Sequence, residues 1–193
     1  QFSPDDPDIA MFCHEGPWNY VQQRIWIINM KSGEVWPCFR QKEDDCVGHE
    51  FWTRNGDIIF DNRRGGHDGT ISNTKSQVYA SETVSTEPPY FGFARKDGKV
   101  YRRIDMPYYC NHYFANANLT MFVGDAVEDI VLIQPEADGS AKMKVLANHN
   151  TTWHYQRSHC HPTFSWDGRK LLYAADTDQW HDNLFLVEVP ERI

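Results

Sequence analysis

The sequence predicts an all-β fold built from repeated sheets, the blades of a β-propeller. A phenylalanine that opens the same kind of segment recurs at Phe2, Phe51, Phe114 and Phe164, with spacings of 49, 63 and 50 residues. A period of roughly 40 to 50 residues with short strands and turns is typical of propeller blades. No window carries an apolar period of 3.6 residues over the length of a helix. We therefore interpret the 193 residues as about four blades.

The strands are predicted from short runs rich in β-branched and aromatic residues. The clearest runs cover residues 24–29, 129–134 and 183–189. Turn dipeptides separate such runs, because glycine accepts the backbone angles that tight hairpins require. These dipeptides are Asn55-Gly56, Asp97-Gly98, Asp138-Gly139 and Asp167-Gly168. Aromatic residues make up 14% of the chain, which suits blades that pack through large flat side chains.

The chain is predicted to be one propeller region, residues 1–193. Four blades can close into a ring alone or belong to a larger ring. Because the chain begins at Gln1 inside a repeat and shows no evident strand to close the circle, we expect the C-terminal half of a larger propeller. The second repeat exceeds its neighbours by about 13 residues, and the surplus lies in the polar stretch 63–89. This stretch predicts a long loop insertion.

The net charge and the cysteine content indicate which binding partners and which cellular compartment suit this protein. A net charge of -8 argues against general nucleic-acid binding, which needs a basic face, so an acidic substrate must be attracted locally by a metal or by arginines. The chain has no transmembrane run. Five cysteines, an odd number without CxxC spacing, predict buried thiols in a reducing compartment. The sequence does not predict an oligomeric state.

Three histidines recur at one place in the repeat. His49, His112 and His161 each lie just ahead of a repeat-opening phenylalanine. If the repeats stack around an axis, these imidazoles point toward a common spot. That spot is the first candidate for a functional site.

A metal site is predicted in the segment QRSHCH. On an extended strand His159 and His161 share one face and can bind one ion, while Cys160 points into the blade. Gln156 can add an amide oxygen, and His112 lies at the matching place one repeat earlier. Imidazole with amide oxygen suits Mn, Fe, Co, Ni or Zn, and this ligand set does not choose among them.

Five segments together resemble a known family. FSPDDPDIAMFCHEGPW, QQRIWIINM, GHEFW, MFVGD and QRSHCHPTFSWDGRKLLY are similar to segments of oligogalacturonate lyases, cytoplasmic enzymes of pectin breakdown. The resemblance covers nearly the whole chain and is weakest over 63–89. It implies a seven-bladed, TolB-like propeller, of which this chain supplies about the last four blades. One departure is the segment Ala115 to Thr120, which stands where the family has a DG-type turn.

The resemblance also implies roles for individual residues. Gln156, His159 and His161 match the family's metal motif, and His112 matches the ligand that completes the site, usually with Mn²⁺.

Four further residues match the family's substrate cleft. His49 matches the proposed general base, and Arg24 matches an arginine that holds the substrate carboxylate and stabilises developing charge. His14 and Glu15, in the CHEGPW motif, are expected to face the same cleft and contact substrate.

The implied reaction fits these residue types. A β-elimination across C4 and C5 of a uronide removes the C5 proton, which lies α to a carboxylate. A divalent metal and a guanidinium can both stabilise charge on that carboxylate, and histidine is a suitable base near neutrality. The expected substrates are short oligogalacturonides, digalacturonate or its unsaturated form, and the products are unsaturated monouronates. No residue is predicted to protonate the leaving oxygen.

Other readings stay open. The chain could be a non-catalytic TolB-type propeller that acts as an interaction scaffold, or a hydrolase in which Glu15 or Glu50 activates a metal-bound water. His49 could be an ordinary inner-strand histidine, and Arg24 could form an ion pair with Glu50 or Asp129. By the same plainer interpretation, His14, His149, His154 and His181 lie on the surface or in packing, and His67 is a solvent residue.

Overall fold

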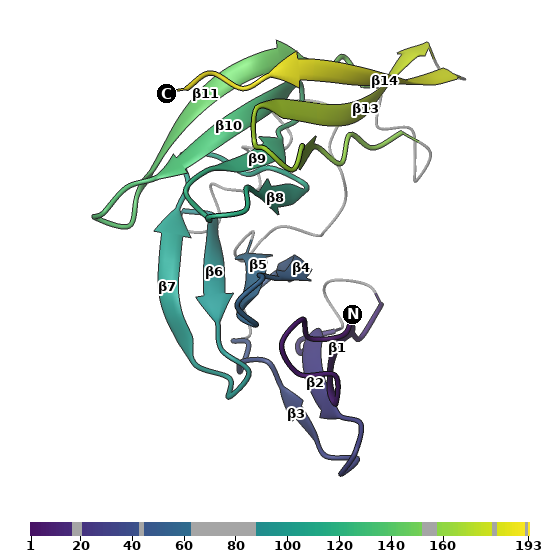
Figure 1. Ribbon diagram of the computed structural model, residues 1–193, viewed down its shortest axis with the longest axis vertical. Coiled ribbons are helices and arrows are strands. Elements are labelled where there is room, and N and C mark those ends of the chain that lie inside the picture. The colour runs from purple at the N-terminus through teal and green to yellow at the C-terminus, as the bar shows by residue number, and fades with distance from the viewer. Residues whose placement is uncertain (17–20, 43–44, 63–87, 152–157, 179–180, 192) are drawn as a thin grey trace. The chain divides into compact units, whose positions relative to one another are not determined.

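Short apolar runs separated by turn residues form strands, as the sequence predicts. The computed structural model describes residues 1–16, 21–42, 45–62, 88–151, 158–178, 181–191 and 193. Within these residues fourteen strands form four antiparallel sheets, and the chain divides into two compact units (Figure 1). Strands β1–β7 belong to the first unit and β8–β14 to the second. The described part of the chain has no helix suited to crossing a membrane.

The first unit contains two sheets. The order of one is β1-β2-β3, and an isolated antiparallel bridge from Phe2 to Ala10 extends it beside β1. The order of the other is β4-β5-β6-β7. The strands are β1 (Ile9–Cys13), β2 (Ile25–Asn29), β3 (Val35–Pro37), β4 (Val47–Trp52), β5 (Ile58–Asn62), β6 (Tyr90–Ala94) and β7 (Val100–Asp105).

The second unit also contains two sheets. Their orders are β11-β10-β9-β8 and β12-β13-β14. The strands are β8 (Tyr113–Ala115), β9 (Phe122–Asp125), β10 (Asp129–Pro135), β11 (Ala141–Asn148), β12 (Thr163–Phe164), β13 (Lys170–Asp178) and β14 (His181–Glu188). The predicted runs 24–29, 129–134 and 183–189 therefore coincide with β2, β10 and β14. Sequential antiparallel strands in each sheet confirm the all-β prediction.

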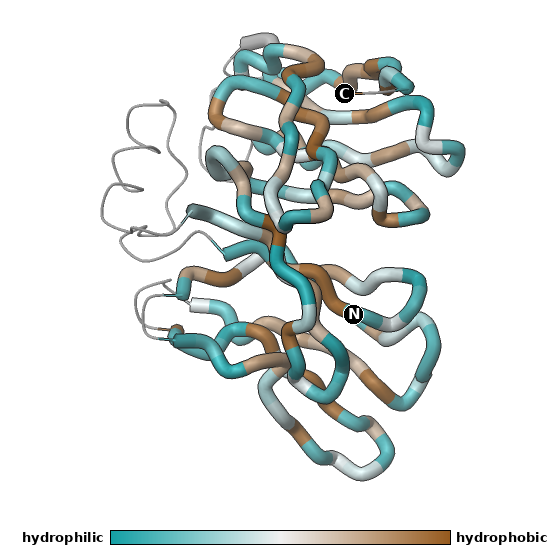
Figure 2. Tube along the Cα trace, turned by 90° about the vertical axis from the view of Figure 1, so that its left-hand side faces the viewer, coloured by the Kyte–Doolittle hydropathy of each residue, from teal (hydrophilic) through white to brown (hydrophobic). Residues whose placement is uncertain are grey.

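Each unit has an apolar core of its own. In the first, Phe60 on β5 stacks on Phe39 with ring centroids 4.2 Å apart and meets the edge of Tyr90. In the second, Ile130 of β10 and Leu171 of β13 are fully buried in one cluster. Hydrophobic and hydrophilic stretches are interspersed along the trace of both units (Figure 2). The inner strands β5, β6 and β9 are buried at every position.

The turns use the predicted glycines. Gly56, Gly98, Gly139 and Gly168 all have a positive φ, between 71° and 88°, which residues with a side chain rarely adopt. In the turn that departs from the family pattern, Leu119 takes the place of glycine with φ 58°. The Asn116 side chain accepts the backbone N–H groups of Thr120 and Met121 and so supports this turn.

Two predictions about organisation stay untested. The long loop predicted for 63–89 lies outside the described residues, apart from residues 88 and 89. The prediction that residues 1–193 are a single region, the C-terminal half of a larger propeller, stays a prediction.

Candidate active site

A β-bulge positions His49 at the start of β4. Gly48 pairs with Asp61 on β5, the register then shifts, and regular pairing resumes at Phe51. His49 follows Gly48 within this irregular stretch and has φ 48°, a left-handed backbone uncommon for any residue but glycine. Bulges re-aim a side chain away from the regular pleat and are frequent beside active sites. The side chain of His49 is accordingly 28% exposed although it belongs to a strand.

His112, just before β8, occupies the position in its sheet that His49 occupies in the first unit. The N–H of Asn111 donates to the carbonyl oxygen of Asp125, so Asn111 occupies the place of Gly48, and His112 follows it. Asp125 then holds His112 twice: its Oδ1 accepts the backbone N–H at 2.6 Å and its Oδ2 lies 2.7 Å from the ring Nδ1. The Asp125 side chain is fully buried.

The ionisation of Asp125 reflects these contacts. Burial alone would raise the pKa of this carboxyl, but the charge of His112 and the two hydrogen bonds outweigh burial and hold the pKa below its usual range.

The HCH segment is not a strand, which corrects the sequence prediction. Residues 158–162 have no regular structure and β12 begins only at Thr163. His161 has φ 42°, so its backbone cannot be extended. The carbonyl oxygen of Cys160 accepts the N–H of Ala174, which gives His161 the same register as His49 and His112. Cys160 is 1% exposed and belongs to the core cluster, as predicted.

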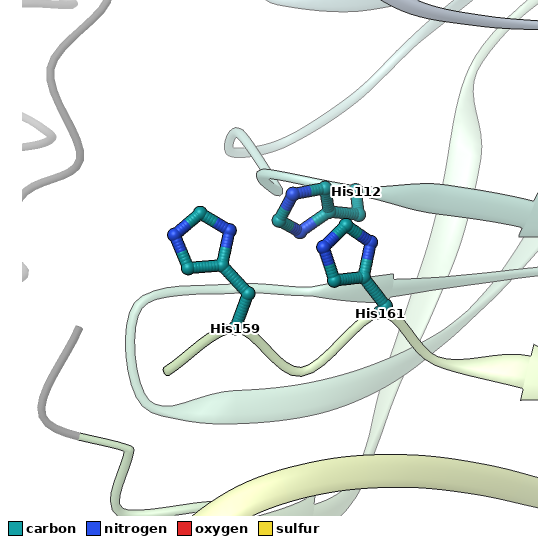
Figure 3. Close-up of side chains that lie close together, drawn as sticks. All are labelled: His112, His159 and His161. Carbon is teal, nitrogen blue, oxygen red and sulfur yellow. The ribbon is translucent and has the colours of Figure 1, made fainter. Parts of the chain in front are cut away.

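Three imidazoles from the second unit converge. The ring centroids of His112 and His161 are 3.8 Å apart, and those of His159 lie 5.2 Å from His112 and 5.6 Å from His161. One ring nitrogen of each lies within 4.8 Å of the others, so the three could hold a metal ion. Figure 3 shows His159 and His161 projecting from one side of their segment toward His112. The predicted fourth ligand, Gln156, lies outside the described residues.

The donor set suits a divalent ion. A metal-binding imidazole commonly gives its other ring nitrogen to a carboxylate, which sets the tautomer. Asp125 occupies that position at the Nδ1 of His112, which leaves Nε2 for an ion.

The repeat prediction for the histidines is therefore correct in register. Each of the three histidines directly follows a residue that pairs with the equivalent position of the second strand in its sheet. These pairs are Gly48 with Asp61, Asn111 with Asp125 and Cys160 with Ala174. The phenylalanines mark the repeat less well. In its sheet Phe164 pairs with Leu171, which is the position that Trp52 takes when it pairs with Ile58. Phe51 and Phe114 therefore lie one residue earlier in their repeats than Phe164 does.

His49 has its own buried carboxylate. Its Nδ1 lies 3.4 Å from Oδ1 of Asp61, whose side chain is fully buried. Neither Asp61 nor Asp125 was predicted from the sequence. The available signal was an aspartate at the end of the second strand, 12 residues after His49 and 13 after His112.

Arg24 lies immediately before β2 and is 4% exposed. Its Nη2 donates to Oε2 of Glu15 at 3.1 Å, and its Nη1 donates to the carbonyl oxygen of Gly16 at 3.2 Å. The ion pair anticipated with Glu50 or Asp129 is thus made with Glu15, whose side chain is 79% exposed. His14 is also exposed, and its N–H donates to the carbonyl oxygen of Arg24. Glu15 and Arg24 therefore form one structural unit.

Two other titratable residues have defined environments. Burial raises the pKa of Glu50, with a further contribution from the negative charge of Asp61. His149 was expected on the surface or in packing, and it is a buried packing residue. Its Nδ1 accepts the N–H of Thr151, and its Nε2 lies 2.9 Å from the carbonyl oxygen of Ala126. All five cysteines are free thiols.

The fold and the histidine cluster define a class: a β-propeller with a candidate site for a divalent metal. Comparison with known proteins is more specific. A family model described as oligogalacturonate lyase matches residues 1–193, and the chain belongs to this family.

Sequence relatives agree with this assignment. The chain is 25% identical to an oligogalacturonide lyase of Pectobacterium atrosepticum and 24% identical to an oligogalacturonate lyase of Dickeya dadantii. In both cases the match covers 100% of this chain and 50% of the relative. The chain thus spans about half the length of the curated relatives it matches.

Solved structures share the fold. An oligogalacturonate lyase in complex with manganese has a TM-score of 0.74 and 20% identity, and the match covers 98% of this chain and 47% of that one. An oligogalacturonate lyase of Vibrio parahaemolyticus has a TM-score of 0.73 and 22% identity, with 95% and 46% covered. These similarities confirm the propeller fold class.

Proposed function

We propose that the protein carrying this chain is a metal-dependent lyase that cleaves short oligogalacturonides by β-elimination. The substrate is digalacturonate or its unsaturated form, and the products are unsaturated monouronates. The observation that carries the proposal is the convergence of three imidazoles in a chain of the oligogalacturonate lyase family. The manganese-bound relative with the same fold supports Mn²⁺ as the ion.

The metal is held by the histidine cluster. His112, His159 and His161 supply three ligands, and Gln156 is proposed as the fourth. When bound, a divalent ion supplies Lewis-acid stabilisation of charge on a carboxylate.

His49 is the proposed base. Its ring is partly exposed, while the carboxylate behind it is fully buried. Such an imidazole can take up the C5 proton of a uronide at neutral pH, and general bases of this kind contribute roughly 10²- to 10⁴-fold to the rate.

Arg24 is the proposed substrate-carboxylate partner. Its guanidinium already binds a carboxylate, that of Glu15, whose side chain is largely in solvent. Since the guanidinium is buried and only Glu15 is exposed, a uronate carboxylate that enters from the solvent side can take the place of Glu15 on Arg24 and form the same charge-assisted hydrogen bonds. His14, exposed beside Glu15, is proposed to contact the same substrate.

We also propose a cytoplasmic location. Five free cysteines support a reducing compartment, because disulfides form and persist in oxidising ones. Cell fractionation tests this location directly.

The test is a spectrophotometric elimination assay on the complete natural protein. Digalacturonate is offered with manganese and again after chelation, and the ultraviolet absorbance of an unsaturated uronide is followed. We expect metal-dependent absorbance that His49→Ala abolishes while bound metal is retained. His181→Ala is the matched control, since His181 is an exposed histidine on β14.

Absence of product from a folded, metal-loaded protein overturns the proposal. Saturated hydrolysis products would then favour a hydrolase using Glu15 or Glu50. The absence of any reaction would favour the interaction scaffold.

A further inference from the structure

A carboxylate sealed from solvent lies directly behind the ring of His49. Asp61, the fourth residue of β5, has a fully buried side chain whose Oδ1 is 3.4 Å from Nδ1 of His49. The imidazole is 28% exposed, and its Nδ1 is the ring atom that lies near the buried carboxylate. Burying a carboxylate is costly unless it is paired, and the ring of His49 offers a group that can pair with it.

The chain contains an internal copy of this arrangement. In the sheet of β8 and β9, Asp125 occupies the same register and its Oδ2 lies 2.7 Å from Nδ1 of His112. There the carboxylate fixes the Nδ1-protonated tautomer and presents Nε2 outward. A histidine that follows the paired residue of the first strand, with an aspartate at the facing position of the second strand, thus occurs in both units, although only His49 of the two has a positive φ.

The blade does not need this aspartate in order to form. In the third copy of the register, Ala174 stands where Asp61 and Asp125 stand, and its N–H still bonds to the carbonyl oxygen of Cys160. The following histidine, His161, adopts a positive φ just as His49 does. The bulge therefore forms with or without the carboxylate, which points to a role for Asp61 beyond strand pairing.

We propose that Asp61 is the positioning residue for His49: it holds the ring with the proton on Nδ1 and leaves Nε2 unprotonated to accept a proton from substrate. This inference rests on the proposed function of His49 as base. The Nδ1–Oδ1 distance of 3.4 Å is long for a hydrogen bond. Hydrogen bonds of catalytic groups are often long in the absence of substrate and shorten when it binds.

The step is a proton transfer with a simple balance. The C5 proton moves to Nε2 of His49, the C5–H electron pair forms the C4–C5 double bond, and the C4–O bond breaks with its electrons on the leaving oxygen. The Asp61 carboxylate stabilises the imidazolium that results, as a buried carboxylate does for a catalytic histidine in other enzymes.

The first test needs no turnover. In the complete natural protein labelled with ¹⁵N-histidine, the resonances of His49 are assigned by their loss in His49→Gln. We expect the Nδ1-protonated tautomer in the wild type and an altered tautomer ratio in Asp61→Asn, because an amide can donate to Nδ1. A wild-type His49 protonated only on Nε2 overturns the proposal, whether or not the variant folds.

The second test separates kcat from KM. Asp61→Asn is expected to lower kcat by about 100-fold, with KM and bound manganese nearly unchanged, because general-base catalysis contributes roughly 10²- to 10⁴-fold. Asp57→Asn, which removes a carboxylate at the other end of the same hairpin, is the matched control and should keep wild-type kcat. A folded Asp61→Asn protein with kcat within about twofold of wild type refutes the role of Asp61. An inactive wild type refutes the proposed lyase function instead, and the tautomer measurement still decides the Asp61–His49 relationship.

Discussion

Asp125 contacts His112 at two points: one carboxylate oxygen lies 2.6 Å from the backbone nitrogen of His112 and the other lies 2.7 Å from its ring Nδ1. Because both oxygens are used by one residue, the ring can neither rotate nor exchange its tautomer without breaking a buried hydrogen bond. The imidazole is therefore held with its Nε2 available to an ion. Under the proposed function, this arrangement reduces the entropy cost of binding the metal.

The first prediction follows from this pair. Asp125→Asn should lower manganese affinity by roughly 10- to 100-fold, the usual effect of removing a carboxylate that orients a metal-binding histidine. Isothermal titration of the metal-free protein measures it. Asp182→Asn, a change of the same charge on exposed β14, serves as the control. Equal affinities in the two variants would mean that Asp125 only supports the strand pairing.

The second prediction concerns the ligands themselves. Manganese at about 100 times its Kd should stabilise the wild type by about 2.7 kcal/mol, because a ligand that binds only the folded state shifts the unfolding equilibrium by mass action. His159→Ala should lose most of this metal-induced rise in Tm, whereas His181→Ala should keep it. Thermal unfolding with manganese and with chelator gives the comparison. An undiminished rise in the His159→Ala protein would place the ion elsewhere.

A third prediction uses the raised pKa of Glu50. A carboxyl whose pKa is higher in the folded than in the unfolded chain favours folding below the unfolded pKa, and this contribution disappears as pH rises through the folded value. Glu50→Gln should therefore be more stable than the wild type at pH 7, and the difference should vanish near pH 4. Urea unfolding at both pH values measures this.

The control for Glu50→Gln is Glu34→Gln, a change at an exposed glutamate. It should alter stability little at either pH. A Glu50→Gln advantage of equal size at pH 4 and pH 7 would rule out an ionisation effect.

The fourth prediction tests the turn at Leu119. Its φ of 58° costs a residue with a side chain about 1–2 kcal/mol, and glycine avoids that cost. Leu119 is partly buried, so the loss of its side-chain contacts offsets part of this gain. We therefore expect Leu119→Gly to stabilise the protein by about 0.5–1 kcal/mol, a rise in Tm of about 1–4 °C for a chain of this size. Thermal unfolding of the variant provides the measurement.

The reciprocal change is Gly168→Ala in the corresponding turn of the next repeat. Gly168 has φ 71° and no atom within 4 Å of an added Cβ, so only backbone strain opposes the substitution. It should destabilise the protein by about 1 kcal/mol. If both variants destabilise it, side-chain packing at Leu119 outweighs backbone strain.

Local chemistry made much of the fold predictable. The strand at 24–29 depends on its β-branched residues, and the turn at Asp167-Gly168 depends on glycine's freedom at positive φ. Both signals are contained in a few consecutive residues. The recurrence of His49, His112 and His161 could be predicted for a similar reason, because equivalent positions of successive repeats have the same strand pairing. The family resemblance rests on these ordered motifs.

The sequence by itself determined the all-β class, the repeat, the turns and which histidines share one place in the repeat. Only the tertiary structure decided how those histidines are held. Asp61 and Asp125 meet their partners 12 and 13 residues away because strand pairing and a bulge set the register, and no local pattern encodes that pairing. The failure of the extended-strand prediction at His161 has the same physical cause. The bond between Cys160 and Ala174 gives that segment a bulge, and a bulge replaces the two-residue alternation of a strand.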